Sequence, residues 1–189
     1  MVMNEEPIFV IPTYRLRDVG ETIEKYDDNF WKNGNSVKLM VFDDSSIATH
    51  QKYFKRLEQT KTHNDVFYVG PNEKNKFIHF LNKKLERGKL EEILNSLFRP
   101  SYGGNRNFTL LYTIGNLMIS SDDDMRPYGI TTEGFESLSE DEVSRGKIVS
   151  AELNGLKNVE YDVLGSFMEV LGKKVREIPK NYLRGELLV

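Results

Sequence analysis

The sequence predicts an α/β fold with a mostly parallel, Rossmann-like sheet that carries helices on both faces. Short apolar runs alternate with segments of helical periodicity along the chain. Most of the apolar runs end in proline, glycine or acidic residues, as buried strands do at a sheet edge. The chain has 189 residues, of which 39% are hydrophobic and 29% are charged. These values are typical of one globular domain, which we expect to span residues 1–189.

Four apolar runs are predicted strands of the sheet. Pro12 ends the first run, and Gly70 with Pro71 closes the third. The fourth run leads directly into three consecutive aspartates. The runs are Ile8–Ile11, Val37–Phe42, Val66–Val69 and Leu117–Ile119.

Apolar residues at helical spacing predict the helices between these strands. The clearest stripe follows the first strand, and a longer Lys-rich stretch from Asn72 to Phe98, broken at Gly88, is expected to cover the sheet. The polar run Asp43–Ser46 is suited to cap the second helix. The stripes are Leu16, Val19, Ile23, Tyr26 and Phe30; Ile47, Phe54 and Leu57; Phe77, Leu81, Lys84 and Leu85 before Gly88; Leu90, Ile93, Leu94, Leu97 and Phe98 after it; and Phe108, Leu111, Tyr112 and Gly115.

Beyond the aspartates the pattern is less regular. The segment Thr131–Arg145 is acidic and partly helical in its spacing. Lys147–Leu153 is predicted to be a strand, and Tyr161–Leu171 is predicted to be a helix.

Composition excludes several classes of function. The net charge is −3, and no basic stripe with interleaved aromatic residues occurs, so we expect no nucleic-acid partner. The chain has no cysteine, which excludes disulfides and thiolate chemistry. Its acidic first residues do not resemble a secretory signal, and no apolar run is long enough to span a membrane. A cytoplasmic protein is expected, and work at the membrane surface is compatible with this.

The triplet Asp122–Asp124 is the most informative motif. Three carboxylates at the exposed end of a strand repel one another and are costly to desolvate. A hard divalent cation such as Mg²⁺ or Mn²⁺ would stabilise them, because it prefers carboxylate oxygen. Such a cation commonly collects the oxygens of a substrate diphosphate. The alternative is a solvated acidic turn.

Polar residues also follow two other predicted strands. Pro12-Thr13-Tyr14 follows the first strand, and Asp43-Asp44 follows the second. Ligands of open α/β sheets bind outside the carboxyl ends of the strands. We therefore expect these loops and the triplet to lie close together.

In this order, the motifs resemble the inverting GT-A glycosyltransferases of family 2. The resemblance rests on Pro12-Thr13-Tyr14, on Asp43-Asp44-Ser45-Ser46, on Gly103–Asn107 with Gly115 beyond it, and on the acidic strand end. It covers roughly residues 7–127, weighted by the place of each motif in its element. It implies a metal-dependent transferase that moves a sugar from a nucleotide-diphosphate donor, a UDP-sugar by default, to an acceptor such as a glycan, a lipid-linked molecule or a protein.

The resemblance also implies roles for individual residues. Pro12, Thr13 and Tyr14 would border the nucleobase. Asp43 would accept a hydrogen bond from the base or ribose, and Asp44 would share that role or cap a helix. Arg106 and Asn107 would approach the diphosphate or the donor sugar.

In this family pattern the triplet corresponds to the metal-binding Asp-X-Asp element. Asp122 and Asp124 would bind Mn²⁺ or Mg²⁺, and Asp123 is a further donor-site candidate. The sequence does not decide which two carboxylates turn inward.

The chain departs from the family after the triplet, where the catalytic base is expected. Glu160, Asp162 and Glu169 are candidates by position only, with Asp162 preferred, although each is a typical solvated helix charge. The chain is expected to lack part of the usual acceptor region, or to be a compact or retaining variant. The 72–98 segment is an insertion relative to the family and could also form a dimer interface.

Two other functions stay open at this stage. A nucleotide-sugar-binding or assembly module without catalysis would keep the donor pocket and lose the base. A nucleotidyltransferase is less favoured, because it needs a glycine-rich loop after the first strand and Pro12–Leu16 contains no glycine.

Overall fold

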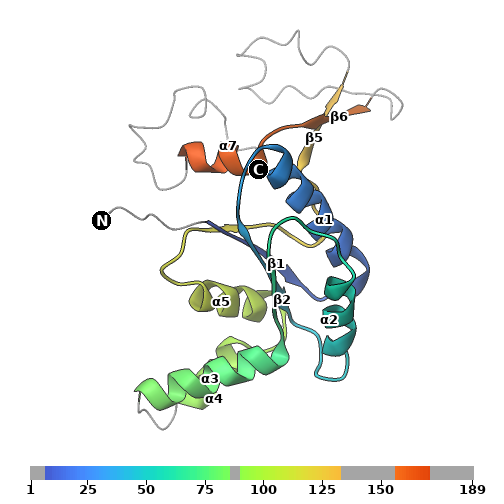
Figure 1. Cartoon of the computed structure of the whole chain (residues 1–189). Coiled ribbons are helices and arrows are strands. Elements are labelled where there is room, and N and C mark those ends of the chain that lie inside the picture. The colour runs from blue at the N-terminus through green and yellow to red at the C-terminus, as the bar shows by residue number, and fades with distance from the viewer. Residues whose placement is uncertain (1–6, 86–89, 133–155, 171–189) are drawn as a thin grey trace. The chain divides into compact units, whose positions relative to one another are not determined.

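A computed structural model describes residues 7–85, 90–132 and 156–170 (Figure 1). The chain divides into two compact units, Met1–Arg126 and Pro127–Val189. The expected helical part of Thr131–Arg145 beyond Thr132, the strand Lys147–Leu153 and the break at Gly88 lie outside the described residues.

The first unit contains a parallel sheet of four strands, β1 (Ile8–Thr13), β2 (Lys38–Asp43), β3 (Val66–Val69) and β4 (Met118–Ser120). Their spatial order is β3-β2-β1-β4. In the register, Ile8 lies opposite Lys38 on one side and Met118 on the other. The predicted α/β class and parallel sheet are therefore confirmed, and the arrangement is Rossmann-like.

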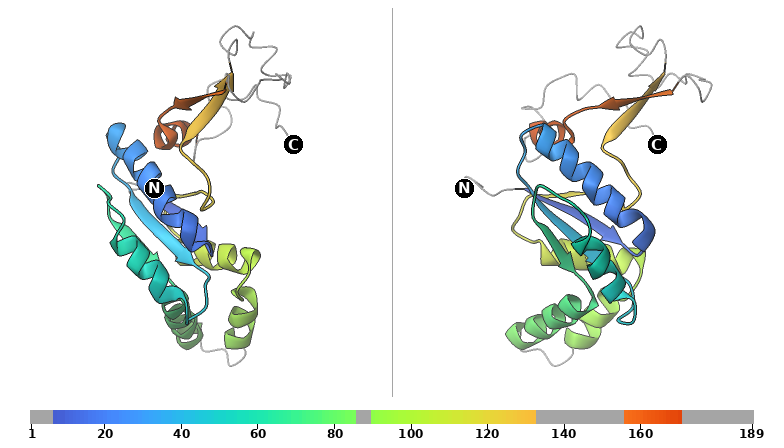
Figure 2. Two further views of the ribbon diagram at one scale, coloured as in Figure 1. Left: turned by 90° about the vertical axis from the view of Figure 1, so that its right-hand side faces the viewer. Right: turned by 45° about the vertical axis from the view of Figure 1, so that its right-hand side comes forward.

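The helices cover both faces of this sheet (Figure 2). α1 (Leu16–Lys32) and α2 (His50–Glu58) pack on one face. α3 (Pro71–Leu85), α4 (Leu90–Leu97) and α5 (Tyr102–Tyr112) lie on the other. The strand order explains this division. The chain moves across the sheet in one direction from β1 to β3 and then in the opposite direction to β4. Because crossovers between parallel strands are right-handed, a change of direction puts the connecting helices on the other face.

The alternation of side chains along β1 builds two cores, one on each face. Phe9 faces α1, and its ring centroid lies 4.5 Å from that of Tyr26 and 5.0 Å from that of Phe30. Ile8 and Val10 belong to the opposite core, which includes buried residues of the 72–98 segment. The segment therefore covers the sheet, as predicted, through Leu94, Phe98 and the partly buried Phe77, Leu81 and Leu90. The predicted stripe is wrong at Leu85, Ile93 and Leu97, which are 54%, 59% and 45% exposed, and Ile78 is buried instead. The second core comprises Ile8, Val10, Phe42, Val69, Ile78, Leu94, Phe98 and Phe108.

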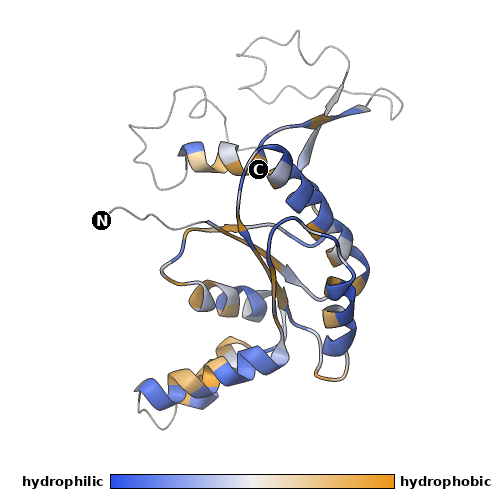
Figure 3. Cartoon of the chain, in the orientation of Figure 1, coloured by the Kyte–Doolittle hydropathy of each residue, from blue (hydrophilic) through white to orange (hydrophobic). Residues whose placement is uncertain are grey.

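Figure 3 shows hydrophobic residues along the central strands, while the helices are mixed in character. This is the distribution expected for a sheet buried on both faces. Among the described residues, no helix combines the length and the apolar character needed to cross a membrane.

The predicted register of α2 is wrong. Ile47 precedes the helix and is 59% exposed, and Phe54 is 48% exposed. Tyr53 is the residue of α2 that is buried. The predicted cap also fails, because Thr49 is the N-cap residue and makes no side-chain capping bond. A helix of nine residues offers too few apolar positions to fix its own rotation.

Two further boundaries differ from the predictions. α5 begins at Tyr102, before the predicted stripe that starts at Phe108, and ends at Tyr112. Gly115 therefore lies beyond the helix, where it adopts a φ of 91° that favours glycine.

The second unit contains two antiparallel strands, β5 (Tyr128–Thr132) and β6 (Leu156–Glu160), and the helix α7 (Val163–Val170). The predicted helix Tyr161–Leu171 is confirmed over the bounds of α7. The strands β5 and β6 were not predicted, because neither has a clear alternation of apolar and polar residues.

We expect Phe108→Ala to destabilise the fold by about 3–5 kcal/mol, as cavities left by large aromatic residues do. Phe108 is 1% exposed, and its ring contacts those of Phe42, Phe77 and Phe98. Urea denaturation measures the change. Leu110→Ala on the same helix is the control, because Leu110 is 58% exposed. Similar losses in both variants would contradict the assigned core.

Candidate functional site

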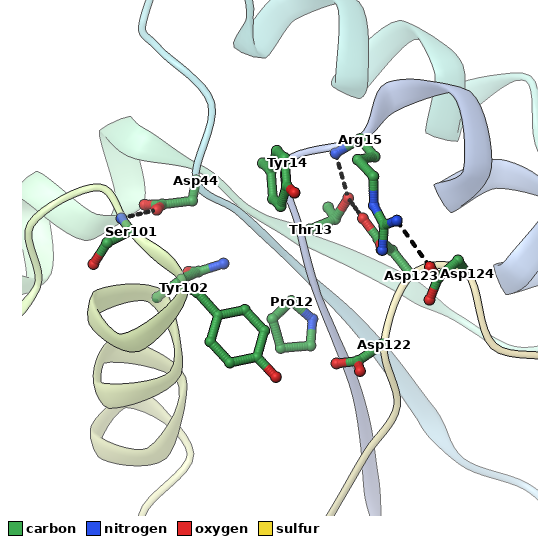
Figure 4. A pocket seen from close by; sticks show the side chains of 11 residues that line it. Pro12, Thr13, Tyr14, Arg15, Asp44, Ser101, Tyr102, Asp122, Asp123 and Asp124 are labelled. Atoms are coloured by element: carbon green, nitrogen blue, oxygen red, sulfur yellow. Dashed lines mark hydrogen bonds and ion pairs between the residues drawn. The ribbon is translucent and has the colours of Figure 1, made fainter.

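A pocket of about 180 Å³ opens at the carboxyl ends of the strands in the first unit (Figure 4). The chain reverses its direction across the sheet between β1 and β4, which is where ligands bind in folds of this type. The pocket joins loops that are far apart in the sequence, as the sequence analysis expected. Its lining residues are Pro12, Thr13, Tyr14, Arg15, Asp44, Ser101, Tyr102, Asn105, Asp122, Asp123 and Asp124.

Asp123 is the buried member of the acidic triplet, with 2% of its surface exposed. The Thr13 hydroxyl donates a hydrogen bond of 2.6 Å to its carboxylate, and the Arg15 guanidinium donates a second. The Thr22 hydroxyl donates to the main-chain oxygen of Asp123. Asp123 therefore ties the end of β4 to β1 and to α1.

Asp122 and Asp124 are the outward members. Their side chains are 46% and 50% exposed. The guanidinium of Arg106 lies 2.8 Å from Asp122, and that of Arg15 lies 2.8 Å from Asp124. The structure thus separates the triplet into one inward and two outward carboxylates, which the sequence did not decide.

In the structure, Arg15 and Arg106 provide the positive charge next to the acidic triplet, where a divalent cation was expected from the sequence. The hydrogen bonds that Arg15 donates to the carboxylates of Asp123 and Asp124 raise the pKa of its guanidinium above the usual value. Asp122 and Asp124 still fit a hard divalent ion in chemistry and exposure, because both offer carboxylate oxygens at the pocket wall. Such an ion would compete with the two guanidiniums for these oxygens.

The first turn of α5 forms the opposite wall. Ser101 caps this helix by accepting a hydrogen bond of 3.0 Å from the Gly104 backbone N–H. A Cβ at position 104 would lie 1.9 Å from the carbonyl oxygen of Arg99, so only glycine fits there. Arg106 extends from this helix, with its guanidinium 4.4 Å from the centre of the Tyr102 ring.

Asp44 joins the wall to the rest of the fold. Its carboxylate lies 2.6 Å from the Lys74 ammonium on α3 and accepts a hydrogen bond of 2.6 Å from the Ser101 backbone N–H. The side chains of Asp44 and Lys74 are 8% and 9% exposed. Burial raises the pKa of the Asp44 carboxyl, and this effect outweighs the opposing influence of Lys74.

Asp43 lies next to the pocket and does not line it. It is 1% exposed and accepts two hydrogen bonds of 2.7 Å from Ser45, one from the backbone and one from the hydroxyl. The Tyr68 hydroxyl donates a third bond of 2.6 Å. Burial and the bond to Asp43 raise the pKa of Tyr68. The contact of Asp43 with a base or ribose stays a prediction.

The remaining predicted residues divide between pocket and scaffold. Pro12, Thr13 and Tyr14 line the pocket, and Tyr14 is 68% exposed. The Asn107 amide donates to the Leu97 carbonyl oxygen at 3.3 Å, which links α5 to the end of α4. In this structure neither Asn107 nor Arg106 is part of the pocket lining, and Arg106 reaches the site only through its contact with Asp122.

The predicted base, Asp162, belongs to the second unit. Its carboxylate accepts a hydrogen bond of 2.8 Å from the Gly165 backbone N–H, and its carbonyl oxygen accepts one from the Ser166 hydroxyl. These are the bonds of a residue that caps the start of a helix. Its catalytic role stays a prediction.

Four residues that line the pocket were not predicted from the sequence: Arg15, Ser101, Tyr102 and Asn105. Arg15 could have been found, because it directly follows the Pro-Thr-Tyr motif. Asn105 donates to the Phe42 carbonyl oxygen at 2.9 Å, while its own side-chain oxygen is buried without a hydrogen-bond partner in the described structure. Ser101 and Tyr102 were not predicted, because the predicted helix began after them.

Within the described residues, a different group satisfies a geometric criterion for metal ligands. Ligand atoms of Asp27, Asp28 and His63 lie within 4.8 Å of one another. However, the Asp27 carboxylate accepts hydrogen bonds from the backbone N–H groups of His63 and Asn64 and from the Asn64 side chain. These bonds give Asp27 a structural role that anchors the loop before β3 to α1.

Comparisons with known proteins give no identification. No model of a protein family matches this chain, and neither a curated protein nor a solved structure matches it.

We expect Lys74→Met to destabilise the fold by about 3–5 kcal/mol near neutral pH, because it leaves a buried carboxylate without its counter-charge. Loss of Lys74 raises the pKa of Asp44 further above the unfolded value. The penalty is therefore full above that raised pKa and shrinks as the pH falls and Asp44 takes up a proton.

Urea denaturation at pH 8 and pH 5 measures this effect. Lys76→Met is the control on the same helix, because Lys76 is exposed. A penalty that is equal at the two pH values would contradict the assigned pairing.

Proposed function

We propose that this chain is a GT-A-type glycosyltransferase that moves a sugar from a nucleoside diphosphate, a UDP-sugar by default, to an acceptor hydroxyl. One observation carries the proposal. The Pro-Thr-Tyr loop after β1, the acidic triplet after β4 and the start of α5 line a single pocket at the switch point of the sheet. These are the segments that carry the resemblance to family 2 in the sequence.

The charges of the pocket support the binding of a diphosphate together with a cation. Asp122 and Asp124 would hold Mn²⁺ or Mg²⁺, which would stabilise the departing diphosphate as a Lewis acid. Arg106 would donate hydrogen bonds to the diphosphate oxygens, and these bonds strengthen as negative charge develops on the leaving group. Its planar guanidinium suits phosphate oxygens. The exposed ring of Tyr14 offers a face for a nucleobase.

A second candidate is a module that binds a nucleotide sugar without transferring it. The observation that favours this module is the helix-capping role of Asp162. In the described part of the second unit, the carboxylate of Asp162, the predicted base, therefore has a structural role at the start of α7.

We expect a nucleoside diphosphate to raise the melting temperature only when Mn²⁺ is present, because each ligand supplies part of the other's binding site. A thermal-shift panel of nucleoside diphosphates, with Mn²⁺ and with EDTA, measures this. The shift is expected to vanish in Asp122→Ala/Asp124→Ala and to persist in the control Asp65→Ala, because Asp65 is exposed and belongs to neither acidic group. A shift that survives in the double variant without metal would contradict the site.

Slow hydrolysis of the donor sugar separates the transferase from the binding module. We expect the chain to release free sugar from its preferred nucleotide sugar with Mn²⁺, since water can replace the acceptor hydroxyl in the reaction. Chromatography of the released nucleotide measures the rate, with Asp122→Ala/Asp124→Ala as the inactive control. Tight binding with no hydrolysis and no transfer would favour the module.

A further inference from the structure

Asn105 lines the pocket from the first turn of α5 and carries a buried acceptor that the protein leaves unpaired. The residue is 4% exposed. Its amide nitrogen donates a hydrogen bond of 2.9 Å to the Phe42 carbonyl oxygen at the end of β2, which fixes the orientation of the carboxamide. Its side-chain oxygen is buried and has no hydrogen-bond partner among the described residues. A buried acceptor without a donor is costly, so this oxygen suits a ligand that brings an N–H or O–H group to it.

The resemblance to family 2 assigns the contact with the base to a different residue, Asp43. In the structure both carboxylate oxygens of Asp43 are already in use. One accepts from the Ser45 backbone N–H, and the other accepts from the hydroxyls of Ser45 and Tyr68. Asp43 also lies outside the pocket lining. It therefore stabilises the loop after β2 and does not face the ligand.

Asp44 does line the pocket, but its carboxylate oxygens are in use as well. One accepts from the Lys74 ammonium, and the other accepts from the Ser101 backbone N–H. The ion pair with Lys74 also compensates the charge of Asp44. At this side of the pocket, the acceptor without a partner in the described structure is thus the oxygen of Asn105.

The position of Asn105 indicates which part of a ligand it would meet. Asn105 is bonded to the end of β2, whereas the acidic triplet follows β4, and these strands flank β1 on opposite sides. The charged groups of a ligand belong near the triplet and Arg15, so an uncharged ring belongs near Asn105. The pocket of about 180 Å³ is smaller than the roughly 300–1,000 Å³ of sites that enclose a whole drug-sized ligand, and it suits a single ring.

We propose that Asn105 recognises the nucleobase, because its side-chain oxygen accepts a hydrogen bond from a ring N–H. This inference rests on the proposed function, whose default donor carries uracil, a ring with one such N–H. Pro12, Tyr14 and Tyr102 also line the pocket and offer ring surfaces against which a planar base can pack (Figure 4).

The fixed carboxamide makes this contact selective. Because Phe42 holds the amide nitrogen, Asn105 cannot turn to present a donor without losing that bond. A ring nitrogen that lacks hydrogen would then place its lone pair against the oxygen of Asn105, and both groups would stay unpaired. Selectivity that depends on an unpaired buried group is the strong kind.

Uridine and 3-methyluridine test the inference without metal or phosphate, since a methyl group replaces the hydrogen of the ring N–H in the second nucleoside. We expect the full chain in EDTA to bind uridine about three- to tenfold more tightly than 3-methyluridine, as one hydrogen bond provides. Titrations followed by ¹⁵N–¹H NMR measure both dissociation constants.

Asn105→Ala removes the acceptor and leaves room for the methyl group, so this variant is expected to bind the two nucleosides with equal affinity. Asn116→Ala is the matched control and should keep the preference, because Asn116 is exposed and outside the pocket lining. Asn105→Ser serves as a second variant in case Asn105→Ala fails to fold, since its hydroxyl is too short to reach the same ligand atom.

A preference for uridine that occurs in the unmodified chain and in Asn116→Ala, and disappears in the Asn105 variants, would support the assignment. Equal affinities in the unmodified chain, no binding of either nucleoside, or a preference that persists without Asn105 would overturn it. If the preference depends on Asn105 and no nucleoside diphosphate shows Mn²⁺-dependent binding, the inference stands and the metal-dependent transferase fails. If Mn²⁺-dependent binding is found and Asn105 has no effect on the preference, the proposed function stands and the inference fails.

Discussion

The buried carboxylate of Asp123 is the constraint on which the candidate site depends. A carboxylate that is removed from water must keep its hydrogen bonds and a counter-charge. Thr13 and Arg15 supply them, so the end of β1 is fixed against the end of β4. Because Asp123 points inward, its neighbours in the triplet are turned outward to the pocket. The same contact thus shapes the pocket and selects the residues available to a ligand.

A second buried charge fixes the other wall. Asp44 joins the end of β2 to α3 through Lys74 and to the start of α5 through Ser101. Two kinds of contact hold α5 in position: this polar contact at its start and the aromatic core around Phe108. They also position Tyr102 and Arg106, which belong to this helix. The segment 72–98, which interrupts the resemblance to family 2, therefore takes part in building the pocket through Lys74.

The sequence predicted the features that depend on local periodicity. The strands of the main sheet and the buried stripe of α1 were recovered, and the strand ends correctly indicated where polar groups would meet. The rotation of α2 was not recovered, because tertiary packing buries Tyr53 in place of Phe54. The partners of the triplet could not be read either, since Arg106 and Asp122 meet only after α5 and β4 have packed. The roles of Asp43 and Asp44 as acceptors for Ser45, Tyr68 and Lys74 are likewise properties of the folded state.

The hydrogen bond between Thr13 and Asp123 joins residues 110 positions apart. Contacts across such distances require closure of a long loop and form slowly. Since β4 is the last strand of the parallel sheet to be synthesised and pairs with β1, the pocket cannot form before β4 has left the ribosome. Ligand binding at this pocket would therefore require that β1 and β4 have paired. A partly folded chain in which they have not paired would show no binding.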